Sequence, residues 1–171
     1  MRKMISLALI CAVLGSIPVV EGQNQATQQP PQAGKKLEAL FNTAEMPFTK
    51  SEEGSYIAVI TVEQNESERF NVGLSSLGND PNDERYQIVR MYFFLGQIPK
   101  GTSFSPALIK QINQWNVNLT MGRVIAVGNA VVYTSSSWLA RTDANTLALD
   151  AALGHYASAD LRKELAPYLK Q

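Results

Sequence analysis

Reactive and metal-binding side chains are scarce in this chain. Its 171 residues include one cysteine, Cys11, and one histidine, His155. One cysteine cannot form an intramolecular disulfide, and one histidine excludes metal clusters of several imidazoles and two-histidine relays. We interpret His155 as a structural histidine beside the apolar face of a helix.

Motifs of catalysis and phosphate binding are also absent from the sequence. It contains no Gly-x-Ser-x-Gly elbow, no Ser-x-x-Lys pair and no glycine loop followed by Lys-Ser or Lys-Thr. Ser135–Ser137 is interpreted as a loop, and the acidic turn 78–84 lacks the spacing of a calcium loop. We therefore predict a protein that is not an enzyme, with no catalytic residue, metal or cofactor.

Neither sign of charge predominates. The chain carries 15 Lys and Arg against 15 Asp and Glu. Such a balance gives no electrostatic footprint for nucleic acid, so nucleic acid is not an expected partner.

The first 22 residues have the layout of a secretory signal. A basic start at Arg2 and Lys3 precedes an apolar run, Met4–Val20, with a cleavage site expected after Gly22. The run is short and interrupted for a membrane anchor, which is the alternative. We predict an exported protein, periplasmic or secreted, with no stable membrane span and no thiol once residues 1–22 are removed.

Two further regions follow the signal. Residues 23–34 are polar, interrupted by proline and without an apolar stripe, so we expect a disordered leader. Residues 35–171 have the length of a single domain. From Lys35 a helical pattern places four apolar residues on one face: Leu37, Leu40, Phe41 and Ala44.

Alternating apolar residues predict three strands after this helix. The predicted strands are Tyr56–Glu63, Arg69–Ser75 and Arg85–Leu95, with Gln64–Glu68 as a polar loop. The third is apolar on both faces, which is typical of an interior strand.

The stretch from Ser105 to Tyr133 is the best specified. Ser105 can cap a helix that starts at Pro106, and an apolar stripe follows, made of Leu108, Ile112, Trp115 and Leu119. Two β-branched runs, Arg123–Val127 and Ala130–Thr134, flank Gly128-Asn129, a tight hairpin loop.

After Thr142-Asp143, which can cap a helix, the pattern predicts one long helix or two consecutive helices, Ser158 capping the second. The expected apolar face consists of Leu149, Ala152, Leu153 and Tyr156. The order is thus α-βββ-α-ββ-α. Because the strands come in hairpins, we predict an α+β fold: an antiparallel sheet of about five strands with helices packed on one face.

This order, together with Leu108, Ile109, Ile112, Asn113, Trp115 and Asn116 before a strand pair and a Leu-rich C-terminal helix, resembles the YbjN family of bacterial proteins. The resemblance implies the fold of type III secretion chaperones over residues 35–171 and a regulatory or chaperone-like module that binds protein, often as a dimer. It supplies no catalytic residue to assign here.

The predicted second hairpin is apolar on both faces, and one helix layer covers only one of them. We therefore expect an interaction surface for a protein partner or a second copy in a homodimer, carried by Ile125, Val127, Val132, Tyr133 and Trp138. Helices covering both faces are the alternative.

A second hypothesis is an envelope carrier that binds a small apolar ligand between sheet and helices. Its pocket would be lined by Tyr92, Phe93, Phe94 and Trp115.

Overall fold

The computed structural model describes residues 31–62, 66–78 and 83–169 of the chain. The predicted signal peptide and most of the predicted leader lie outside the described residues. No helix within the described ranges is long and apolar enough to cross a membrane.

The elements alternate between helix and antiparallel strands. In chain order they are α1 (Pro31–Thr43), β1 (Phe48–Lys50), β2 (Tyr56–Thr61), β3 (Ser67–Ser76), η2 (Glu84–Tyr86), β4 (Gln87–Gln97), α2 (Pro106–Asn118), β5 (Arg123–Val127), β6 (Ala130–Trp138), η3 (Leu139–Arg141), α3 (Ala144–Leu165) and η4 (Ala166–Tyr168). The described residues form a six-stranded sheet in the order β1-β2-β3-β4-β6-β5, with every neighbouring pair antiparallel.

The predicted α+β fold is confirmed, with one strand more than expected. The additional strand is β1, which pairs Phe48 with Ala58 and Lys50 with Tyr56 at one side of the sheet. Three residues are too few to show an alternating pattern, so this strand has no signature in the sequence. As predicted, β4 is interior, because it lies between β3 and β6.

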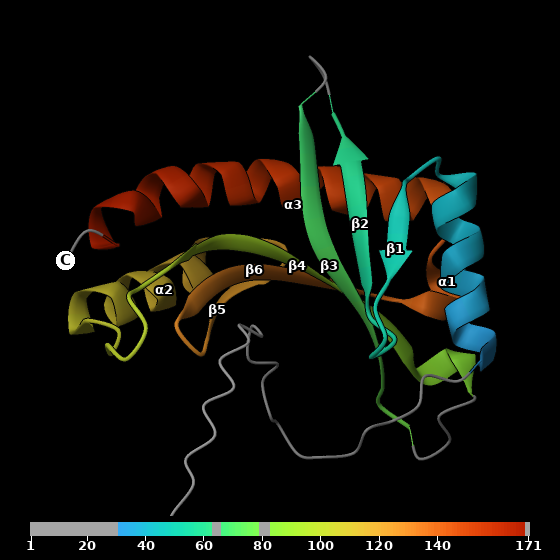
Figure 1. Ribbon diagram of the computed structural model, residues 1–171, viewed down its shortest axis with the longest axis horizontal. Helices are drawn as coiled ribbons and strands as arrows, with labels where there is room; N and C mark the ends of the chain where they lie inside the picture. Colours follow the sequence, from blue (N-terminus) through green and yellow to red (C-terminus); the bar gives the residue numbers. More distant parts are fainter. Residues whose placement is uncertain (1–30, 63–65, 79–82, 170–171) are drawn as a thin grey trace, which may run out of the picture.

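All three α-helices of the described chain lie on one face of the sheet (Figure 1). The long helix α3 runs across the strands and contacts β4 and β6, α1 packs beside α3, and α2 contacts β5. The predicted helix layer on one face is thereby confirmed.

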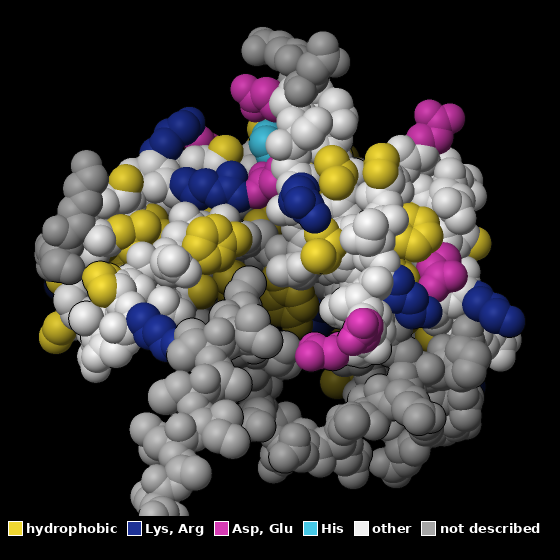
Figure 2. Space-filling model, viewed as in Figure 1, with side chains coloured by type: hydrophobic (Ala, Val, Ile, Leu, Met, Phe, Trp, Pro, Cys, Tyr) yellow, Lys and Arg dark blue, Asp and Glu magenta, His cyan; other side chains and the backbone are white. Residues whose placement is uncertain are grey.

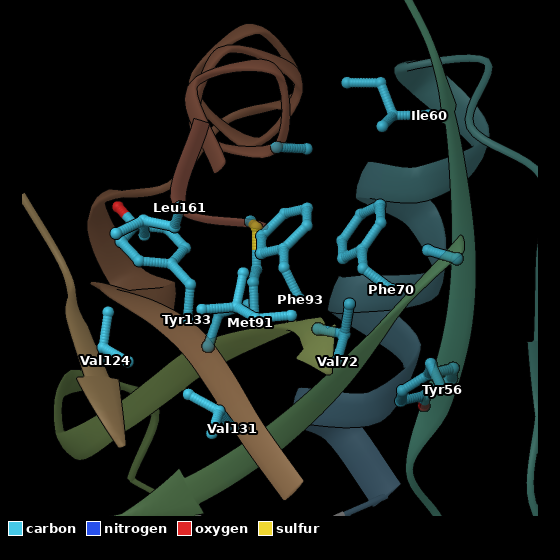
Figure 3. Close-up of a cluster of buried hydrophobic side chains, with 14 of the residues drawn as sticks. Tyr56, Ile60, Phe70, Val72, Met91, Phe93, Val124, Val131, Tyr133 and Leu161 are labelled. Carbon is cyan, nitrogen blue, oxygen red and sulfur yellow. The ribbon is translucent and has the colours of Figure 1, made fainter. Parts of the chain in front are cut away.

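Side chains between this layer and the sheet form the core (Figure 3). Phe93 of β4 stacks on Phe70 of β3, with ring centroids 4.8 Å apart, and both side chains are buried. Gly154 of α3 lies directly over the Phe93 ring, where a Cβ atom would come within 2.3 Å of it. Helix and sheet therefore approach so closely that only glycine fits.

The stretch 105–133 folds as a helix and a hairpin as predicted, except that α2 ends at Asn118 and Leu119 is already extended. Ser105 caps α2 by accepting a hydrogen bond from the Leu108 amide at 3.2 Å, and β5 and β6 pair Val127 with Ala130. The Asn116 side chain also bonds both backbone groups of Val124, donating to its carbonyl at 2.8 Å and accepting from its amide at 2.6 Å. Two side-chain bonds thus tie α2 to β5.

Three local expectations are wrong. Helix α1 begins at Pro31, inside the predicted leader, because the side chain of Ala33 is buried one turn before Leu37. Ser135–Ser137 belongs to β6 and pairs with β4, so it is not a loop. The C-terminal region is one long helix, which is the first of the two alternatives, but Ser158 does not cap a second helix because it is buried in the interior of the first.

The expected apolar face of α3 is also wrong. Leu149, Leu153 and Tyr156 are exposed, whereas the buried stripe is Leu147, Ala151, Gly154, His155, Ser158, Leu161 and Leu165. Gly154 is small because the Phe93 side chain of β4 lies directly against the helix there. His155 and Ser158 are polar because they belong to a polar cluster that is described below.

Asp150 of α3 gives a pH-dependent prediction. Burial raises the pKa of its carboxyl above the ordinary value, and a hydrogen bond with Ser137 opposes that rise. A raised folded-state pKa means that the carboxyl favours folding when protonated and disfavours it as the pH rises through that pKa. Asp150→Asn is therefore expected to increase the free energy of unfolding at neutral pH, by less than about 1 kcal/mol for a partly exposed group.

Urea unfolding at neutral pH and near pH 3 measures the effect. The advantage of Asp150→Asn over the parent chain should shrink in acid, where Asp150 is protonated in both states. Asp160→Asn, at an exposed position of the same helix, is the control. An advantage that is independent of pH would contradict the prediction.

Candidate functional site: the open sheet face

One face of the sheet has no helix of the described chain over it; we call it the open face. Its side chains are those that alternate with the buried core positions of each strand. Large apolar side chains recur along it: Ile57, Val59, Ile88, Tyr92, Phe94, Ile125, Val127, Val132 and Trp138. All of these are partly or largely exposed. In Figure 2 the front of the molecule, where β2 and β3 lie, shows hydrophobic side chains interspersed with basic and acidic ones.

Four of the five predicted surface residues lie on the open face. Ile125 pairs with Val132 and Val127 with Ala130, on the side away from the helices. Trp138 pairs with Ile88 on the same face and is 39% exposed. Their role in binding stays a prediction.

The fifth, Tyr133, belongs to the core. It pairs with Phe93 and Val124 on the helix side of the sheet and is 2% exposed. Its hydroxyl donates to the Met121 carbonyl at 2.9 Å, and burial raises the pKa of the phenol. Figure 3 shows its ring among the core side chains. Tyr133 is therefore wrong as an anchor, since strand neighbours alternate between faces and Val132 occupies the open one.

The open face is hollowed where β4, β6 and β5 lie side by side. The hollow has a volume of about 420 Å³. It is lined by Arg90, Tyr92, Gly122, Arg123, Ile125, Thr134 and Ser136. A partner's side chain inserted there would meet an aromatic ring, an aliphatic chain and two guanidinium groups.

The charged residues of the described strands are unevenly distributed between the two faces, and Lys50 is the one basic strand residue on the helix side. Glu68 is the single acidic residue in the described strands, and it points to the helix side. Arg69, Arg90 and Arg123 lie on the open face, because they pair with Val59, Gly73 and Thr134. The open face thus carries three arginines among apolar and uncharged polar side chains, and the described strands contribute no carboxylate to it.

Glu68 belongs to a buried polar cluster between β3 and α3, which we call the Glu68 cluster: Glu68, His155, Ser158 and Arg162. One carboxylate oxygen lies 2.7 Å from His155 Nδ1, and the other accepts from the Arg162 guanidinium. Ser158 Oγ also donates to the carboxylate, at 3.3 Å. Arg162 Nε reaches the Phe94 carbonyl at 2.9 Å, and burial lowers the pKa of Arg162.

This cluster does not have the geometry of an activated nucleophile. The Ser158 hydroxyl is directed to Glu68 and to the His155 carbonyl, at 2.8 Å, so the imidazole does not accept its proton. Within the described part of the chain, no group of three His, Cys, Asp or Glu residues could hold a metal ion. The Glu68 cluster instead joins β3 to α3.

Sequence reasoning missed this cluster because Glu68 was expected in a polar loop. It lies in β3, 8% exposed, opposite Ile60. One signal was available: Glu68 precedes Phe70 and Val72 at the two-residue period of a strand, which places all three side chains on one face.

The pocket of the carrier hypothesis is not formed by its four residues. Phe93 is stacked in the core, and Trp115 is buried with its Nε1 donating to Glu164 at 2.6 Å. Tyr92 and Phe94 lie on the opposite side of the sheet, on the open face. The four side chains therefore do not line a common cavity.

No family model matches the chain, and no curated protein does. Among solved structures it is similar to the Yersinia pestis type III secretion chaperone SycH, crystallised in complex with a stable fragment of YscM2. That match has a TM-score of 0.44 and 13% sequence identity, and it covers 75% of this chain and 98% of SycH. Membership of the YbjN family stays a prediction.

Proposed function

We propose that this chain is an exported, non-catalytic module that binds another protein through its open sheet face, in a chaperone-like or regulatory role. The observation that carries the proposal is the asymmetry of the sheet: one face is buried under three helices, and the other presents half-exposed aliphatic and aromatic side chains. A surface of this kind is typical of a protein-binding site.

Site-specific photo-cross-linking in intact cells tests the binding. A photoreactive residue replaces Ser136 at the hollow or, as the matched control, Asn113 on the outer side of α2; both positions are exposed. We expect a discrete cross-linked product from position 136 and none from position 113. The product should weaken when Ile125→Ala and Trp138→Ala are added, because these remove apolar contact area from the open face.

Cell fractionation and N-terminal sequencing of the purified chain test export. Recovery outside the cytoplasm with a new N-terminus at position 23 would agree with a cleaved signal. Equal cross-linking from positions 136 and 113, or a chain retained in the cytoplasm with Met1 intact, would contradict the corresponding part of the proposal.

A further inference from the structure

We infer that the open face accepts an acidic segment of the partner protein, in which carboxylate side chains alternate with apolar ones. The inference rests on the proposed function and specifies the chemistry of the partner.

The charges of the open face point to such a segment. Arg69, Arg90 and Arg123 share this face, and none of the carboxylates in the described residues forms an ion pair with them. Four basic side chains elsewhere in the described residues do form ion pairs: Lys50 with Glu38 at 2.9 Å, Arg85 with Asp83, Lys163 with Asp160, and Arg162 with Glu68. Three guanidinium groups on a face to which the described strands contribute no carboxylate favour a ligand that supplies carboxylates.

The hollow indicates where the carboxylates of such a segment would lie. Arg90 pairs with Gly73 and Ser136, and Arg123 pairs with Thr134, so the two arginines lie on opposite sides of β6. Between them the hollow is lined by Tyr92 and Ile125. A segment that crosses β6 would place an apolar side chain against Tyr92 and a carboxylate beside each guanidinium. Arg69, four residues from Gly73 along β3, is about 13 Å further on.

A second copy of the chain fits this face less well. Two open faces packed together would bring six arginines into one interface without a strand carboxylate to oppose them. Like charges placed together across an interface cost several kilocalories per mole. The charge pattern therefore disfavours a homodimer through the open face.

The chain's own first 30 residues do not supply the carboxylates either. Glu21 is the single acidic residue among them, and it is accompanied by Arg2 and Lys3. A partner protein is thus the better match.

Nucleic acid and anionic lipid also carry negative charge. The aliphatic side chains and the hollow of the open face favour a peptide over both. Aliphatic side chains outnumber aromatic ones on the open face, and they do not stack on bases. Arg90 is partly buried in the wall of a hollow, where an inserted side chain reaches it more readily than a planar layer of headgroups. Both alternatives are included in the test.

Fluorescence anisotropy with the purified chain tests the inference. The probes are a labelled peptide of interspersed Glu, Leu and Ser, and two counterparts in which Gln or Lys replaces every Glu. A single-stranded oligothymidylate and vesicles containing phosphatidylglycerol are the other probes. We expect the Glu peptide to bind about tenfold more tightly than the Gln peptide. This preference should disappear at about 1 M salt, where the Debye length falls to about 3 Å.

Variants locate the binding. Arg90→Gln with Arg123→Gln should weaken the Glu peptide about tenfold and leave the Gln peptide unchanged. Lys35→Gln with Lys110→Gln, on the exposed sides of α1 and α2, is the matched control and should have no effect. Arg90→Glu with Arg123→Glu should transfer the preference to the Lys peptide. Unchanged urea midpoints establish that each variant is folded.

The other outcomes overturn the inference. If the Gln peptide binds as tightly as the Glu peptide, and Tyr92→Ala weakens the binding of both, the open face binds peptides without a preference for acidic side chains. The inference is then overturned, and the proposed function is still supported. Tighter binding of the oligonucleotide or the vesicles also overturns it. Binding of no peptide overturns it too, and the proposed function is then decided by the cross-linking experiment.

Discussion

Glu68→Ala is expected to lower the free energy of unfolding by about 3 kcal/mol, the largest effect we predict for a single substitution outside the apolar core. Removing one partner of a buried ion pair leaves the other charge uncompensated, at a cost of about 3–5 kcal/mol. The lower value applies because the Arg162 side chain is 35% exposed and water can partly replace the carboxylate. Ser158 and His155 lose a hydrogen-bond partner at the same time. Urea unfolding measures the loss.

Two substitutions separate the Glu68 cluster from a general effect of charge. Glu66→Ala removes an exposed carboxylate 3.7 Å from His155 Nε2 and should change stability by less than about 0.5 kcal/mol. Glu68→Gln retains hydrogen-bonding capacity without the charge and should fall between the two. If Glu68→Ala costs no more than Glu66→Ala, the Glu68 cluster does not hold β3 to α3.

Gly154→Ala is expected to destabilise the fold by about 2 kcal/mol, although alanine is the better helix former by about 1 kcal/mol. The new methyl group would lie 2.3 Å from Phe93 Cε2. The Phe93 ring cannot tilt away freely, because it is buried and stacked on Phe70. The clash must therefore move α3 away from the sheet. Thermal or urea unfolding of the purified variant measures it.

A double-mutant cycle with Phe93→Leu identifies the cause. A leucine has no atoms at the far side of the ring, so adding Gly154→Ala to Phe93→Leu should cost less than adding it to the parent chain, by about 1 kcal/mol or more. A stabilising Gly154→Ala, as helix propensity alone predicts, would show that the contact between α3 and β4 adapts to the methyl group.

The features predictable from the sequence are those decided by local spacing. The two-residue loop Gly128-Asn129 sets the register of β5 and β6, and Gly128 has the positive φ, 59°, that such a turn requires. Ser105 and Pro106 determine the start of α2 in the same local way. Both predictions are confirmed because each depends on neighbouring residues alone.

The features that could not be predicted depend on contacts between distant segments. Which face of the β5–β6 hairpin becomes part of the core depends on the pairing of Tyr133 with Phe93, 40 positions earlier in the chain. For this reason four of the five predicted surface residues lie on the open face, whereas Tyr133 lies in the core. On α3, a hydrophobicity pattern favours Leu149 and Leu153, whereas the close approach of Phe93 selects the side that contains Gly154. The basic character of the open face emerges only once β3, β4 and β5 are aligned.

The side-chain bonds of Asn116 have a consequence for how a partner can attach. Val124 directs its free amide and carbonyl away from β6, and Asn116 saturates both, as a neighbouring strand would. Strand addition at this margin of the sheet is therefore blocked at its middle, and the opposite margin, β1, offers three residues as a template. Binding of a partner as an additional strand, which depends on backbone hydrogen bonds, is therefore disfavoured at both edges of the sheet. Both margins also disfavour edge-to-edge aggregation, and the selectivity of the proposed binding would have to come from side chains.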